Sequence, residues 1–146
     1  MHLSRGDKIG CGFLSVLVGG PVILIAGAIF LDKVLPSNVR RALPTSATDI
    51  HEYDDTNYFL GEMSQCLKAK MPESEMPGFA ARMGLTARYS TTTYGKLRFH
   101  WHGAEGASWW DPPDTLDGGY LTYKGTSNYS IAKYENGYVY FTATDW

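Results

Sequence analysis

Two histidines separated by one residue are the first candidates for chemistry in this sequence. His100 and His102 lie in the run "KLRFHWH" (residues 96–102), whose alternation predicts a strand with both histidines on one face. Their side chains would be about 6.5–7 Å apart, a spacing that two ligands of one zinc ion can have. A third ligand would have to come from His51, Glu105 or Asp111. Two basic residues share the same face and oppose a cation. We therefore predict a solvated polar face and no bound metal, with His100 and His102 as the alternative ligands.

A tryptophan pair in a long polar segment is the main candidate for binding. The segment "GAEGASWWDPPDTLDGG" (residues 103–119) is rich in glycine, proline and acids, which predicts a long loop. Loops longer than about 12–15 residues are commonly functional or disordered, and adjacent tryptophans argue against disorder. In an extended backbone the two indoles point in opposite directions, so one can anchor the loop while the other contacts a partner. The alternative is that both cap the core. The predicted binding residues are Trp101, Trp109, Trp110, Asp111 and Tyr120.

The acids of this loop are the candidates for catalysis. Glu105, Asp111, Asp114 and Asp117 include enough carboxyl groups for the acid–base pair that glycoside cleavage needs. Nothing near them in the sequence predicts a raised pKa, however. No nucleophile motif, phosphate-binding glycine loop or calcium-loop pattern is present. The sequence therefore favours a protein that is not an enzyme, and it predicts no cofactor.

The charge balance excludes one class of partner. The 146-residue chain has a formal net charge of −2. From Asp32 onward there are 11 Lys and Arg against 14 Asp and Glu. Nucleic-acid binding requires clustered cations for contact with phosphates, so we predict no nucleic-acid partner.

An apolar run near the N-terminus predicts where the protein resides. Residues 9–31 contain no charged side chain. As a helix they would extend about 34 Å, enough to cross a hydrocarbon core of about 30 Å. The alternative is a cleavable signal peptide, since Arg5 and Lys8 form a basic start and Ala26-Gly27-Ala28 resembles a cleavage site. The run is longer than a usual signal peptide core, so we predict a retained membrane anchor.

The anchor divides the chain into four regions. We predict a single-pass protein that contacts membrane lipid through residues 9–31, with its domain outside the cytoplasm. Basic residues flank both ends of the run, and the very short tail favours a cytoplasmic N-terminus. The regions are a tail (1–8), the anchor (9–31), a juxtamembrane linker (32–47) and a small domain (48–146).

The first half of the domain predicts strands and one helix. Residues 48–53 predict a short strand, followed by a turn at 54–57. The stretch 58–71 is ambiguous in its first half, and its second half alternates as a strand that ends at Pro72. Residues 72–86 predict a helix with Ser74 as N-cap. Pro77 would lie in its first turn, Gly84 would end it, and its buried face would contain Met76, Phe79, Ala80 and Met83.

The second half predicts β-structure from Thr91 onward. The clearest signal is "YSIAKYENGYVYFTAT", in which Asn136-Gly137 separates two alternating runs. That turn pairs Ala132 with Phe141 and Tyr134 with Val139 on a core face. The predicted fold class is α+β: an N-terminal transmembrane helix, then one antiparallel sheet of about four to six strands with one packed helix.

Three functional hypotheses follow. The leading one is a membrane-anchored domain of the cell envelope that binds a protein partner, as an inhibitor, an immunity-type protein or an accessory subunit. The second is a small carbohydrate- or metal-handling domain or enzyme that uses the loop from Trp109 to Asp117. The third is a structural subunit of a membrane complex, for which both loop tryptophans should be fully buried.

Overall fold

The fold is described from a computed structural model of the chain. It describes residues 36–57, 62–95, 101, 104, 106–125 and 128–145. The chain divides into two compact units, residues 1–37 and 38–146. The predicted anchor, residues 9–31, lies outside the described residues. Within the described ranges, no helix combines the length and apolar character needed to cross a membrane.

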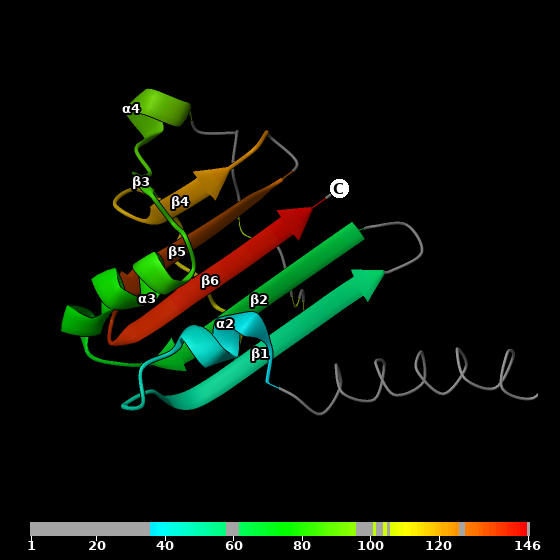
Figure 1. Ribbon diagram of the computed structural model, residues 1–146, viewed down its shortest axis with the longest axis vertical. Coiled ribbons are helices and arrows are strands. Elements are labelled where there is room, and N and C mark those ends of the chain that lie inside the picture. Colours follow the sequence, from blue (N-terminus) through cyan, green and yellow to red (C-terminus); the bar gives the residue numbers. More distant parts are fainter. Residues whose placement is uncertain are drawn as a thin grey trace, which may run out of the picture. The chain divides into compact units, whose positions relative to one another are not determined.

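Residues 38–146 are built on a six-stranded antiparallel sheet with the order β1-β2-β6-β5-β4-β3 (Figure 1). After the β1–β2 hairpin the chain crosses to the opposite edge through α3 (Met76–Arg82) and returns strand by strand, so that β6 lies beside β2. The predicted α+β class and antiparallel sheet are confirmed. The strands are β1 (Thr48–Asn57), β2 (Glu62–Lys70), β3 (Ala87–Arg88), β4 (Tyr120–Tyr123), β5 (Tyr129–Glu135) and β6 (Tyr138–Asp145).

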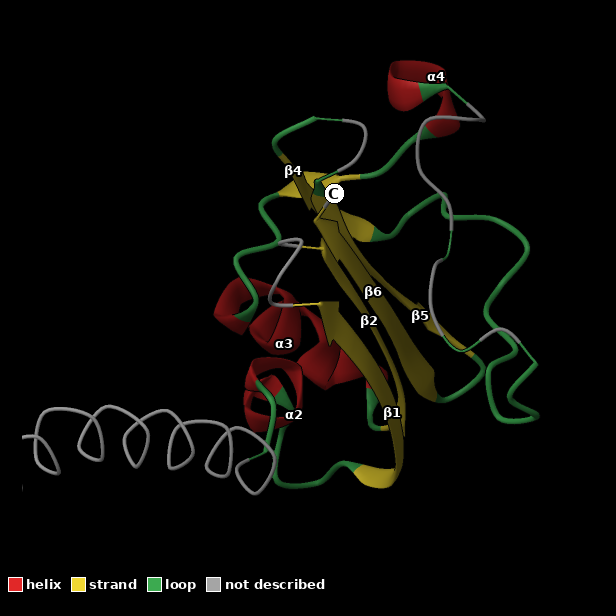
Figure 2. Ribbon diagram, turned by 90° about the vertical axis from the view of Figure 1, so that its right-hand side faces the viewer, coloured by secondary structure: helices red, strands yellow, loops and turns green. Residues whose placement is uncertain are grey.

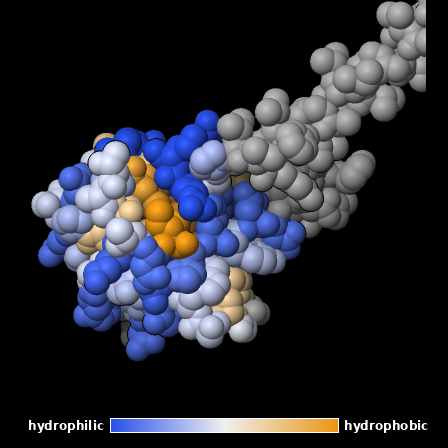
Figure 3. Space-filling view, turned by 90° about the horizontal axis from the view of Figure 1, so that it is seen from below, coloured by the Kyte–Doolittle hydropathy of each residue, from blue (hydrophilic) through white to orange (hydrophobic). Residues whose placement is uncertain are grey.

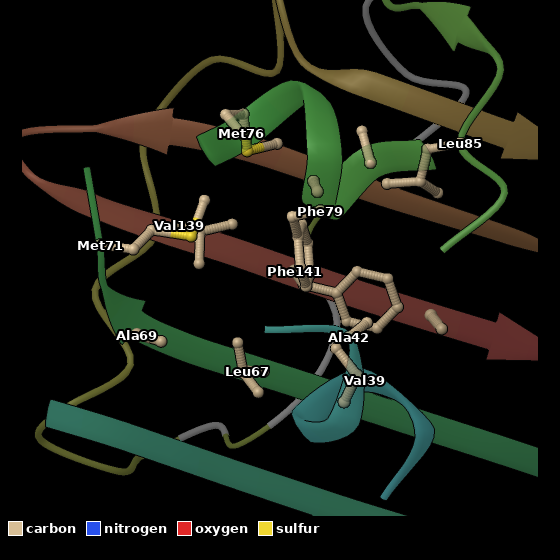
Figure 4. Close-up of a cluster of buried hydrophobic side chains, with 13 residues drawn as sticks. Val39, Ala42, Leu67, Ala69, Met71, Met76, Phe79, Leu85, Val139 and Phe141 are labelled. Carbon is tan, nitrogen blue, oxygen red and sulfur yellow. The ribbon is translucent and has the colours of Figure 1, made fainter. Parts of the chain in front are cut away.

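Two short helices, α2 (Asn38–Ala42) and α3, cover one face of the sheet, which we call the helix side (Figure 2). Alternate residues of β2 and β6 point toward these helices and form the main core (Figure 4). Phe79 of α3 meets Phe141 of β6 edge to face, with ring centroids 6.2 Å apart. Both rings are almost fully buried, and each such burial stabilises the fold by about 1.5–3 kcal/mol.

The predicted helix is present, with a different start. A 3-10 turn, η1 (Glu73–Glu75), leads directly into α3. The N–H of Glu75 donates to the Pro72 carbonyl (3.1 Å), which places Ser74 inside this turn. The prediction of Ser74 as N-cap is therefore wrong, because Glu75 holds that position.

The remaining features predicted for α3 are confirmed. Pro77 lies at its start, where a missing N–H does little harm. Gly84 follows its end with φ +67°, a conformation that costs glycine less than other residues. The predicted apolar face points into the core: Met76, Phe79 and Ala80 are buried, and Met83 is half-buried against them.

A second packed helix lies within the predicted linker. Residues 38–42 form α2, and Val39 and Ala42 are buried in the main core. The Arg82 Nε–H donates to the Ala42 carbonyl at 2.6 Å, which ties α2 to α3. The prediction of one packed helix is thus incomplete, because two apolar residues three positions apart suffice to seat a single helical turn against the sheet.

The β5–β6 hairpin has the predicted register. Ala132 pairs with Phe141 and Tyr134 with Val139, on the helix side. The turn residues Asn136 and Gly137 have φ +52° and +90°, as this tight turn requires.

Two segments differ from the prediction. β1 continues through the turn expected at 54–57, because Asp54 and Asp55 pair with Gln65 and Ser64 of β2. The Gln65 amide also donates to Asp54 (3.1 Å). Residues 91–94, expected to begin β-structure, form the short helix α4 (Thr91–Tyr94), whose first N–H donates to Asp117. In both cases a tertiary partner overrides the local preference.

Viewed from below, the surface is mostly hydrophilic, with one apolar area between hydrophilic residues (Figure 3). Half-buried apolar residues do lie at the margin of the main core, among them Leu43, Ala47 and Ile50. These residues mark where the main core reaches the surface.

Candidate functional site

The long loop before β4 lies on the opposite face of the sheet, which we call the loop side (Figure 2). Within it, the Trp101 Nε1–H donates to the Pro113 carbonyl at 2.8 Å. Lys133 of β5 donates to the Thr115 carbonyl at 2.8 Å. Leu116 is buried in a second, smaller core formed on this side of the sheet. The loop is thus held to the sheet by polar contacts and by apolar packing.

A row of aromatic rings leads from the surface to the sheet. His51 of β1 stacks on Trp109 with ring centroids 5.4 Å apart and a 16° interplanar angle. Trp109 contacts Trp110 (5.7 Å), and Trp110 contacts Tyr140 of β6 (6.2 Å). Trp101 meets Trp110 edge to face at 6.0 Å. The His51 side chain is 40% exposed and Tyr140 only 6%, so the row has an open outer end and a buried inner end.

Lys68 of β2 anchors the loop electrostatically. Its Nζ lies 2.5 Å from Asp111 Oδ1, 4.7 Å from the Tyr138 ring centroid and 5.5 Å from that of Tyr140. The Lys68 side chain is 12% exposed, and that of Asp111 is 63% exposed. Burial is the largest single influence and opposes the charge of Lys68, but the hydrogen bonds and charge interactions with Asp111 and Tyr140 together outweigh it, so the pKa of the ammonium group is raised. The same bond lowers the pKa of Asp111.

At the edge of the sheet, Asp49 links the aromatic row to the surroundings of Lys68. The Tyr138 hydroxyl donates to Asp49 Oδ2 (3.0 Å), and Asp49 Oδ1 shares a hydrogen bond with His51 Nε2 (2.9 Å). The bond from Tyr138, followed by that from His51, lowers the pKa of Asp49. The Tyr138 bond also raises the pKa of the phenol. Because the Tyr140 hydroxyl lies 3.3 Å from Asp111 Oδ1, these contacts form a closed ring.

We call this ring of contacts, with Trp101 against it, the loop-side cluster. Its members come from β1, β2, β6 and the loop, and they are joined by ring contacts, hydrogen bonds and the Lys68–Asp111 ion pair. They are Asp49, His51, Lys68, Trp101, Trp109, Trp110, Asp111, Tyr138 and Tyr140.

Four of the predicted binding residues come together in this cluster: Trp101, Trp109, Trp110 and Asp111. Both members of the tryptophan pair are half-buried, so neither matches the full burial that a purely structural role predicts. The other predicted residue, Tyr120, pairs with Ala132 and packs against the main core on the helix side. The Arg88 guanidinium lies 3.7 Å from its ring centroid. The structure therefore does not bring Tyr120 to the tryptophans.

His100 and His102, which the sequence offers only as alternative metal ligands, lie outside the described residues. In the parts of the chain that the structure describes, no group of three His, Cys, Asp or Glu residues is arranged to hold a metal ion. Cys66 is fully buried on the loop side, where its sulfur accepts a hydrogen bond from the Ala104 N–H (3.3 Å). Burial raises the pKa of this thiol, which makes it a poor nucleophile.

Two of the loop carboxylates, Asp111 and Asp117, are engaged in structural contacts, and Glu105 lies outside the described residues. Asp117 accepts from the N–H and hydroxyl of Thr91 at 2.6 and 2.8 Å, and the backbone bond in particular lowers the pKa of Asp117. The pKa of Asp111 is lowered as well. A general acid needs a raised pKa, so these two groups do not suit acid catalysis near neutral pH. The arrangement suits recognition through rings, the exposed carboxylates of Asp49 and Asp111 and the half-buried ammonium of Lys68.

Sequence reasoning did not select four members of the cluster, Asp49, Lys68, Tyr138 and Tyr140, and it considered His51 only as a possible third metal ligand. Several of these residues share one signal, which is their register in the sheet. His51 pairs with Lys68, Lys68 with Tyr140, and Tyr140 with Lys133, which forms one row across four strands. Only the last of these pairings can be read from the sequence, because the β5–β6 hairpin has a clear turn signal, the β1–β2 hairpin has none that fixes its register, and β2 and β6 are distant in the chain.

Comparison with known proteins supplies no relative: no family model, curated protein or solved structure matches this chain.

Proposed function

We propose that this chain is a single-pass, membrane-anchored protein of the cell envelope whose small domain binds a protein partner through the loop-side cluster. As an inhibitor, an immunity-type protein or an accessory subunit, it would require a specific surface and no catalytic group. The observation that carries the proposal is the state of Trp109 and Trp110, which are half-buried on a loop that the sheet holds in place.

The rigidity of the cluster supports a binding role. Tryptophan and tyrosine supply much of the binding energy at protein interfaces. Trp109 is supported on one side by His51 and on the other by Trp110, so its ring is already ordered before a partner arrives. An ordered side chain loses less conformational entropy on binding, which leaves more of the contact energy for affinity.

The membrane anchor is supported by the sequence of residues 9–31. An uncharged run of this length is typical of a membrane-spanning helix. Carbonate washing followed by ultracentrifugation tests it directly, and we expect the intact chain in the pellet. Recovery of the intact chain, with its N-terminus, in the soluble fraction would contradict the anchor.

The binding role is tested by affinity capture of the full-length chain in nonionic detergent. Trp109→Ala removes the ring next to His51, the outer of the two loop indoles, without opening the main core, and we expect it to reduce recovery of the partner at least about tenfold, as loss of a hot-spot residue does. The matched control is Tyr123→Ala, since Tyr123 is a 46% exposed aromatic residue on β4. No partner beyond chaperones, or equal capture by wild type and Trp109→Ala, would contradict the role.

A carbohydrate ligand is the second candidate. The exposed side chains of Asp49, His51 and Asp111 place acceptors and a donor next to the indole of Trp109, a combination that also suits sugar hydroxyls and sugar rings. Calorimetric titration of the full-length chain against a glycan panel and against zinc tests this reading. Heat that is abolished by Trp109→Ala would favour it, and the absence of heat in every titration would remove it.

A further inference from the structure

The two edges of the sheet, as the described residues form it, differ in length. β3, at one edge, contains two residues. β1, at the other edge, contains ten and is the longest strand among the described residues. It pairs with β2 on one side, and no described strand lies on its other side (Figure 1). The edge of β1 therefore presents a row of backbone groups that can accept another strand.

β1 lacks several of the devices that usually protect an edge strand. It contains no proline and no lysine. Its register shift is confined to the start, between Thr48 and His51, where Asp49 has φ +49°. From His51 to Asn57 the pairing with β2 is regular. Residues 51–57 thus form a regular edge that can be extended.

The charge of β1 restricts which strand can pair with it. The strand contains Asp49, Glu52, Asp54 and Asp55 and no Lys or Arg. Two copies of this chain joined through β1 would bring acids together, and like charges on facing strands are destabilising. A basic strand would meet the opposite charge. The acids of β1 therefore disfavour self-association and favour a cationic partner.

The same strand contributes to the loop-side cluster. His51 and Asp49 belong to β1, and His51 stacks on Trp109. A segment lying along β1 would consequently run next to the exposed end of the aromatic row. We propose that the partner supplies an extended, basic segment that adds to the sheet as a strand beside β1. This inference rests on the proposed binding function and identifies the partner's contact segment.

The test uses the full-length chain in nonionic detergent and a peptide that alternates lysine and valine as the probe. Two control peptides separate the contributions: one has glutamate in place of lysine, and one carries N-methyl groups on alternate backbone nitrogens. We expect hydrogen exchange to slow in residues 48–57 when the lysine peptide is added. Neither control peptide should have this effect. Protection confined to residues 106–119, equal effects of the lysine and N-methylated peptides, or no protection at all would overturn strand addition.

A charge-reversal pair completes the test. Asp55→Lys changes an exposed acid on β1, and Asp114→Lys makes the same change at an exposed acid in the loop. We expect Asp55→Lys to weaken lysine-peptide binding about tenfold and Asp114→Lys to change it less than about twofold, because charge attraction falls steeply with distance in salt. Equal effects of the two variants would overturn the assignment to β1. If the peptide result is negative while Trp109 still controls partner capture, this inference fails and the proposed function stands.

Discussion

Over β2 and β6, the two faces of the sheet are covered through different kinds of contact. On the helix side, Leu67, Val139 and Phe141 meet apolar residues of α2 and α3, and burial alone accounts for the contact (Figure 4). On the loop side, the neighbouring residues Lys68 and Tyr140 meet a loop through an ion pair, hydrogen bonds and ring contacts. Successive residues of the same strands thus serve a dense core on one face and a polar, aromatic cluster on the other.

This difference predicts that the helix side contributes most of the stability, whereas the loop side is available for recognition. Apolar packing is non-directional and strong in sum, whereas each exposed polar contact contributes about 1 kcal/mol or less. The loop side should therefore open at a lower free energy than the helix side. Stability is thus supplied mainly by the helix side, so a substitution on the loop side can affect binding without unfolding the main core.

The largest loss of stability is expected from a cavity in the main core on the helix side. Phe141→Ala removes a ring that is 1% exposed and leaves a cavity against Phe79. We expect the free energy of unfolding to fall by about 3–5 kcal/mol, measured by urea denaturation of the full-length chain. A loss below about 1 kcal/mol would show that the helix side is not the dominant core.

An intermediate effect is expected from the centre of the aromatic row. Trp110→Ala removes contacts to Trp109, Trp101 and Tyr140, but the indole is only half-buried. We expect a loss of about 2 kcal/mol, less than for a fully buried aromatic residue. The comparison fails if Trp110→Ala destabilises the protein as much as Phe141→Ala does.

Opening of the loop side can be followed at Cys66. In a Cys11→Ser background it is the only thiol of the chain, and it is fully buried on that side. Trp110→Ala should accelerate its labelling by a thiol reagent about tenfold or more, because the loop covers it less of the time. Tyr123→Ala serves as the control and should leave the rate unchanged.

The smallest effect is expected from the ion pair. Asp111→Asn leaves the 12% exposed Lys68 without its counter-charge, and we expect a loss of about 1 kcal/mol at neutral pH because Asp111 itself is well exposed. Asp114→Asn, at an exposed acid of the same loop, is the matched control and should change stability less.

The pH dependence of this pair has a defined sign. The folded-state pKa of Asp111 is below its ordinary value of 3.8. Its stabilising contribution is therefore present above pH 3.8 and is lost as the pH falls through the lower, folded-state pKa. Urea denaturation at neutral pH and near pH 3 should show that wild type loses more stability on acidification than Asp111→Asn. Equal acid sensitivity would mean that Asp111 contributes nothing through its charge.

Local patterns in the sequence were sufficient for some elements. The Asn136-Gly137 turn determined the β5–β6 register because few residues tolerate positive φ at both positions. The apolar face of α3 followed from its helical spacing. The turn expected at 54–57 was wrong because pairing with β2 outweighs the turn preference of Asp and Asn.

The candidate site was only partly predictable. Trp109, Trp110 and Asp111 are conspicuous as residue types in a long polar loop, and that composition was enough to select them. Lys68 is one of two alternating lysines in β2, and nothing local distinguishes it from Lys70. Tyr120 was selected for its type and its place near the loop, yet the register of β4 turns it to the helix side.

By itself the sequence determined what each segment can become: an apolar run of membrane-spanning length, alternating strands, one tight hairpin and a tryptophan-bearing loop. These properties follow from side-chain type and spacing over a few residues. The tertiary structure decided that β6 lies between β2 and β5, which places Tyr140 beside Lys68 and beneath Trp110. Such contacts join residues far apart in the chain, so they depend on how the whole sheet buries its apolar area and not on any local preference.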